Sequence, residues 1–153
     1  MDRGERAECY FRQGYNCSQA MVLAFSDLLN LDEAALSRMA CGFGGGISRL
    51  REVCGTMSGT VMILDLLFGY EGPETGEKKR ALYARVQDMA GRLEKANGSI
   101  VCRELLGLRQ QRDTPEAEAR TAGYYQKRPC AGLIAAAARI LQAYLQENGI
   151  EGA

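Results

Sequence analysis

Apolar residues recur along most of this chain with the period of an α-helix, and strictly alternating runs are almost absent. The pattern predicts helices over about residues 7–14, 16–29, 33–40, 52–68, 74–97, 102–108 and 130–146, with another starting at Thr114. The segment 74–97 is the clearest, because its apolar residues share one face and charged residues occupy the rest. We therefore expect an all-α fold, a compact bundle of six to eight helices.

Residues that start and stop helices agree with this pattern. Gly14 suits the end of the first helix, Asp32 suits an N-cap, and Pro115 suits the first turn of a helix capped by Thr114. The stretch 42–46 contains four glycines and is expected to be a loop that follows an apolar stripe of Leu36, Met39, Ala40 and Phe43. Since no linker or repeat divides the chain, we expect one helical domain over residues 1–153.

Charge and hydropathy exclude several classes of partner. The 19 basic and 19 acidic residues cancel, which gives no sign of a nucleic-acid partner. The longest apolar run, residues 61–68, is broken by Asp65 and is too short for membrane insertion. Because residues 1–6 are too charged for a secretory signal, we expect a cytoplasmic protein.

The chain has six cysteines and no histidine. The missing histidines exclude a Cys–His catalytic pair, an imidazole metal ligand and histidine-ligated haem. In a reducing cytosol, cysteines are better explained by metal binding or catalysis than by structural disulfides. The candidate chemistry is therefore that of thiolates.

Helical periodicity separates these cysteines into two groups. Cys9 and Cys41 lie off the apolar stripes and have no predicted role. The other four lie at or near a helix start, on its apolar face, and are the predicted catalytic or metal-binding residues: Cys17, Cys54, Cys102 and Cys130. Because unpaired N–H groups and the helix dipole favour thiolate, we expect at least one of these thiols to have a pKa below ~8.5, and we expect the sulfurs to converge. The alternative is that each cysteine packs as a small apolar residue.

Glycines lie close to these cysteines in the sequence. The loop 42–46 is not a phosphate-binding loop, because no strand precedes it and no Gly-Lys-Ser/Thr follows. Its bare N–H groups could instead approach a thiolate or a cluster sulfur. Two more glycines, four residues apart, leave a smooth face on the helix that follows Cys54. The predicted cofactor-binding glycines are Gly44, Gly45, Gly46, Gly55 and Gly59.

Over about residues 5–142 the chain resembles the C_GCAxxG_C_C family of putative redox-active proteins. The resemblance rests on residues 14–20, on residues 42–47 and on the motif at 54–59, where Thr56 replaces the family's alanine. Cys102 and Cys130 supply the remaining cysteines, so the family's four are those that periodicity selects. A similar domain occurs in split-Soret cytochromes, which carry haem and an iron–sulfur centre. Their haem role does not transfer, because this chain has no histidine.

Three functions remain open on these grounds. The first is a redox-active protein, a thiol-based oxidoreductase or electron carrier, whose clustered cysteines cycle between dithiol and disulfide or pass electrons. The second is a module that binds an iron–sulfur cluster or zinc through four thiolates. The third is a helical interaction protein whose cysteines are structural. The redox partner, the substrate and the formation of a homo-oligomer stay open.

Overall fold

A computed structural model describes residues 1–73, 76–109 and 112–153 of the chain. Within these residues it contains no strand, only an isolated antiparallel bridge between Val53 and Val101. The prediction of an all-α fold is confirmed. The helices are α1 (Arg3–Arg12), α2 (Cys17–Ala24), the 3-10 helix η1 (Ser26–Leu28), α3 (Glu33–Ala40), α4 (Gly44–Ile47), α5 (Gly55–Phe68), α6 (Glu77–Asn97), α7 (Cys102–Leu105), α8 (Ala122–Lys127) and α9 (Cys130–Glu147).

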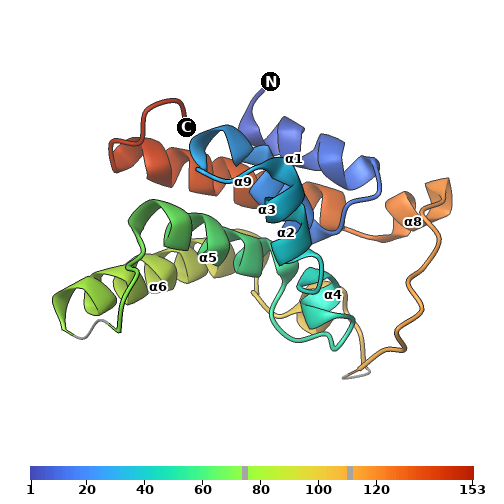
Figure 1. Cartoon of the computed structure of the whole chain (residues 1–153). Helices are drawn as coiled ribbons and strands as arrows, with labels where there is room; N and C mark the ends of the chain where they lie inside the picture. The colour runs from blue at the N-terminus through green and yellow to red at the C-terminus, as the bar shows by residue number, and fades with distance from the viewer. Residues whose placement is uncertain (74–75, 110–111) are drawn as a thin grey trace.

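The helices form two layers that meet at α2. Helices α1 and α9 lie side by side in one layer, and α5 and α6 form the other (Figure 1). Helix α2 packs against α1, α3 and α5, while α9 also contacts α5 and α6. The largest fully buried side chains are Phe25, Met21, Leu23, Leu36, Ile63, Leu64, Met89, Leu93, Ile134, Leu141, Leu145 and Val22. The core therefore lies where α2 meets its neighbours.

Side-chain caps fix the helix starts on one side of the core. Asp2 and Asn16 form capping boxes at the starts of α1 and α2, and Asp32 caps α3 as its sequence position predicts. The Asn16 box fixes the residue that follows it, which is Cys17.

Two glycines allow α5 to approach α2 closely. A methyl group at position 55 would overlap the Sγ of Cys17, and a Cβ at position 59 would lie 2.7 Å from the Cβ of Met21 and 3.1 Å from the carbonyl oxygen of Ser18. Since α2 occupies this space, these glycines serve the packing of two helices.

The sequence pattern was wrong in several details. Helix α2 ends at Ala24 rather than near residue 29, and α5 starts at Gly55 because residues 52–53 take part in the bridge region. No helix starts at Thr114, since residues 115–121 offer no apolar face to bury. The beginning of the helix predicted over 74–97 lies outside the described residues.

The apolar stripe of α3 also faces the core only in part. Leu36 and Ala40 are buried against α2, whereas Met39 is 41% and Phe43 is 38% exposed.

No helix among the described residues is long and apolar enough to cross a bilayer.

The close approach of α5 to α2 predicts opposite effects for two glycine substitutions. Gly59→Ala should lower the free energy of unfolding by about 1–3 kcal/mol, because its methyl group meets Met21 and the backbone of Ser18. Gly91→Ala in α6 is the matched control, since nothing lies within 4 Å of its added Cβ. It should raise stability by up to about 1 kcal/mol. Denaturant unfolding measures both, and equal effects would contradict the packing role of Gly59.

Candidate functional site

The four cysteines that begin helices line one cavity of about 190 Å³. Cys17 comes from α2, Cys54 precedes α5, Cys102 opens α7 and Cys130 opens α9. The exposed Cys9 and Cys41 do not belong to this lining. The fold thus brings together in one place the cysteines that periodicity selects.

The bridge between Val53 and Val101 brings the starts of α5 and α7 together. The N–H of Cys54 donates to the carbonyl of Ile100 at 2.7 Å, and the N–H of Cys102 donates to the carbonyl of Glu52 at 2.6 Å. Alternate residues of extended chain point to opposite faces. Both cysteines therefore project from the face of the bridge opposite the two valines, toward the cavity that they line.

A run of left-handed backbone leads from α4 to this bridge. Gly45 and Gly46 have φ of +68°, which glycine adopts without steric cost, but the run continues through Ile47 at +66°, Ser48 at +47° and Arg49 at +68°. The segment 42–46 that was predicted as a loop thus ends in two left-handed glycines, and the left-handed run continues beyond it to Arg49. Left-handed conformations of residues with a Cβ cost free energy, and such strain concentrates at functional sites. This run places Arg49 and Arg51 on the cavity lining.

Arg51 is the most buried charged group of the site, with an exposed fraction of 4%. Its Nη1 donates to the Sγ of Cys102 at 3.7 Å, and its Nη2 pairs with Asp113 at 3.0 Å. Its Nε is buried and has no hydrogen-bond partner among the described residues. Burial opposes the charge on Arg51, yet Cys102 and Asp113 together raise its pKa above the ordinary value. The side chain is a fixed cation beside one of the four sulfurs.

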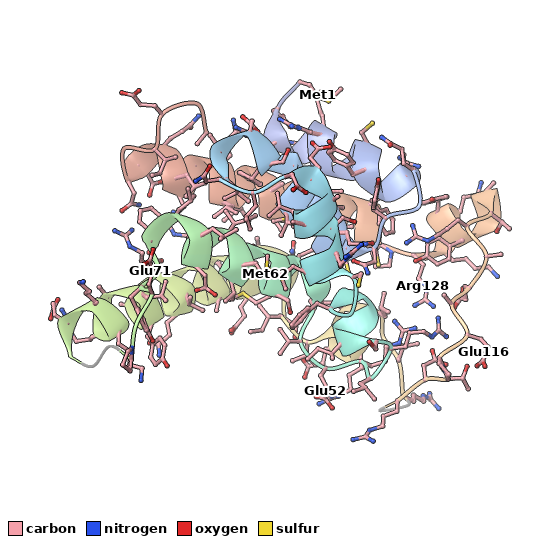
Figure 2. All side chains as sticks on the ribbon, viewed as in Figure 1. Met1, Glu52, Met62, Glu71, Glu116 and Arg128 are labelled. Atoms are coloured by element: carbon pink, nitrogen blue, oxygen red, sulfur yellow. The ribbon has the colours of Figure 1, made fainter. Side chains whose placement is uncertain are left out.

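The non-helical segment 112–121 covers one side of the cavity. Asp113 pairs with Arg49 at 3.0 Å, and Arg120 donates to the carbonyls of Phe11 and Tyr15 while its guanidinium lies 4.4 Å from the ring centroid of Phe11. Arg128, paired with Glu118, lies between this segment and the other helices (Figure 2). Residues far apart in the sequence therefore close the cavity.

The five glycines predicted to contact a cofactor fall into two groups. Gly44 and Gly45 line the cavity, and the backbone of Gly45 partly offsets the rise that burial causes in the pKa of Cys17. Gly46, Gly55 and Gly59 are not part of that lining. A Cβ at position 46 would lie 2.5 Å from the Cβ of Cys102, so this glycine also allows close packing.

Three of the four thiols have raised rather than lowered pKa values. Burial raises the pKa of Cys17 to about 12, and the sulfur of Cys54 adds to this rise. Burial likewise raises the pKa of Cys130 to about 11 and raises that of Cys54, although the hydroxyl of Thr56 and nearby backbone N–H groups oppose the shift at Cys54. At these three cysteines desolvation outweighs the field of the helix end.

The cysteines do not form a site for a metal ion in this arrangement. Among the described residues, no group of three or more cysteines and carboxylates is placed to hold one. Two of the sulfurs have hydrogen-bond partners, which are the hydroxyl of Thr56 and the guanidinium of Arg51. In this arrangement the four sulfurs are not placed as the tetrahedral ligand set that zinc requires.

The arginines are the functional residues that sequence reasoning missed. Arg49 and Arg51 stand between the glycine loop and Cys54, so their position beside two recognised motifs was the available signal. Nothing in the local sequence pointed to Arg120 and Arg128, because a helix starting at Thr114 was expected where the chain instead passes along the cavity.

Residues 15–144 match the model of the family described as "Putative redox-active protein (C_GCAxxG_C_C)". The match covers most of the chain, and the protein belongs to this family. No curated protein and no solved structure matches the chain.

The raised pKa values predict slow alkylation of the partly buried Cys17 and Cys130. In the reduced protein near neutral pH, iodoacetamide should label Cys17 and Cys130 far more slowly than the exposed Cys9 and Cys41. Because only the thiolate reacts, both slow rates should keep rising with pH toward about 12 for Cys17 and about 11 for Cys130. Peptide mass spectrometry measures each site. Rates that level off below ~8.5 would contradict these shifts.

Proposed function

We propose that the protein is a thiol-based redox protein whose working pair is Cys54 and Cys102. The observation that carries this proposal is the buried guanidinium of Arg51, 3.7 Å from the Sγ of Cys102 in a cavity lined by all four cysteines. A cation beside a thiol favours the thiolate, which is the nucleophile of thiol–disulfide exchange. Cys102 is therefore the attacking residue, and Arg51 is its positioning and charge-stabilising partner.

Cys54 is the resolving cysteine in this proposal. It lies on the same face of the Val53–Val101 bridge as Cys102, as its diagonal neighbour. Diagonal neighbours across an antiparallel pair lie about 7–8 Å apart, just beyond the Cα separation typical of a disulfide. A small movement that brings the starts of α5 and α7 closer together would allow the disulfide to form. When Cys54 becomes a thiolate during reduction of the disulfide, the hydroxyl of Thr56, 3.2 Å from its Sγ, donates a hydrogen bond to it.

The reaction has two displacements. The Cys102 thiolate attacks a sulfur of a substrate disulfide, and the substrate's other half leaves as a thiolate. Cys54 then attacks the Sγ of Cys102, loses its proton and releases the second half, so that two protein thiols become one disulfide. Cys17 and Cys130 are proposed as a second pair of thiols in the same cavity that exchanges with the first.

Substitution of single cysteines tests the assignment. Cys102→Ser should lower the rate at which a small disulfide is cleaved by roughly two orders of magnitude or more, while Cys9→Ser and Cys41→Ser keep it. Cys54→Ser should keep the first displacement but stop at a mixed disulfide on Cys102, so that the second thiol is not released. The loss of stability should stay within about 1–3 kcal/mol, the cost of a poorly satisfied buried hydroxyl. Thiol release and thermal unfolding are measured on each variant. Full activity in Cys102→Ser would exclude it as the nucleophile, and a wild-type protein without activity would favour the interaction-protein alternative.

Metal analysis tests the iron–sulfur or zinc alternative. Protein purified without oxygen should contain far less than one metal ion or cluster per chain, because the sulfurs face hydrogen-bond donors. Iron, zinc and acid-labile sulfide are counted in wild type and in Cys54→Ser. A stoichiometric metal that disappears in the variant would replace the dithiol proposal by the metal-binding alternative.

A further inference from the structure

The cysteine cavity has an excess of positive charge. Four guanidinium groups belong to its lining, those of Arg49, Arg51, Arg120 and Arg128. Within the part of the chain that the structure describes, Glu118 is the one acid on that lining, and it is paired with Arg128. Asp113 pairs with both Arg49 and Arg51 at 3.0 Å. Two carboxylates thus face four cations, and an anionic ligand would balance the remainder.

Arg51 also retains an unused hydrogen-bond donor. Its Nη atoms reach Cys102 and Asp113, but its buried Nε has no partner among the described residues. A buried donor without an acceptor costs free energy, and a ligand oxygen that accepts from it would recover that cost. The donor belongs to the same side chain that contacts the proposed nucleophile.

The cavity limits the size of that ligand. An apolar cavity of about 150 Å³ holds a benzene molecule. The volume of about 190 Å³ therefore suits a ligand of roughly five to eight non-hydrogen atoms, and it excludes a peptide disulfide bound whole inside. The ligand is small, anionic and placed against thiols.

We propose that the cavity binds a small sulfur oxyanion with a labile sulfur–sulfur bond, of which thiosulfate is the simplest, as the substrate of the dithiol. This inference rests on the proposed function and adds the substrate class. The guanidinium groups of Arg49 and Arg51 bind the anionic oxygens, as planar forks of donors do for other oxyanions. The sulfur–sulfur bond is the bond that a thiolate breaks by displacement.

The reaction balances with the protein as the reductant. The Cys102 thiolate attacks the outer sulfur of thiosulfate, its sulfur–sulfur bond breaks, and sulfite leaves with the bonding electron pair. Cys102 then carries a persulfide. Cys54 loses its proton, attacks the Sγ of Cys102 and expels hydrosulfide. Two thiols are oxidised to one disulfide, and thiosulfate takes up two electrons to give sulfite and hydrosulfide.

A single-turnover experiment on the reduced full chain tests the substrate class. Thiosulfate should release one sulfite per chain and form the disulfide between Cys54 and Cys102, as mass spectrometry would show. Sulfate, an unreactive analogue, should protect Cys102 but not Cys9 from the neutral reagent N-ethylmaleimide. Dimethyl disulfide is neutral, has no oxyanion and is small enough for the cavity, so its reaction at Cys102, located by mass spectrometry, reports the reactivity of that thiol without oxyanion binding.

Arginine substitutions supply the second measurement. Arg51→Lys should lower the ratio of the thiosulfate rate to the neutral-disulfide rate by at least ~10-fold, the effect of one charge-assisted hydrogen bond. Arg49→Gln should lower the same ratio, and it replaces Arg51→Lys as the test if that variant does not fold. Arg80→Gln, at an exposed ion pair on α6, is the matched control.

The outcomes separate the two proposals. If the neutral disulfide reacts at Cys102 but thiosulfate yields no sulfite, the oxyanion inference is overturned and the dithiol function stands. Protection by sulfate without sulfite release would likewise overturn the substrate class. If neither reagent reacts at Cys102, the proposed function fails and the inference fails with it.

Discussion

The close approach of α5 to α2 is the constraint on which the site depends. Gly55 and Gly59 leave no side chain between the helices, so Cys17, Ser18 and Met21 lie directly against the backbone of α5. Any side chain at position 55 would displace the sulfur of Cys17. The spacing of a cysteine, a glycine and a second glycine four residues later thus has a steric explanation that is independent of any cofactor.

Burial and charge act in opposite directions on the sulfurs that this packing encloses. Desolvation favours the protonated thiol at Cys17, Cys54 and Cys130, whereas a guanidinium lies beside Cys102. One cavity therefore contains sulfurs in different surroundings, although all four lie at helix starts. The proposed division of roles among the thiols rests on that difference, because nucleophilic displacement requires a thiolate.

The sequence predicted what local pattern controls and missed what depends on distant contacts. Periodicity and caps predicted the all-α fold, most helix ends and the cysteines that meet in one cavity. The left-handed run could not be predicted, since Ile47 has no intrinsic preference for it. A single bridge such as Val53–Val101 produces no alternation. The cap signal of Thr114 was overridden because the distant Arg49 donates to the carbonyl oxygen of Thr114 and pairs with Asp113.

A disulfide between Cys54 and Cys102, which lie next to the Val53–Val101 bridge, would connect the redox state of the pair to the stability of the fold. A disulfide between them would close a loop of roughly 50 residues that contains α5 and α6, which removes enough entropy from the unfolded chain to stabilise the folded one by about 4 kcal/mol. By thermodynamic linkage, folding would stabilise the disulfide by the same amount and lower its reduction potential by about 90 mV relative to the unfolded chain. The stability of the fold that contains α5 and α6 would therefore contribute to the reduction potential of the pair.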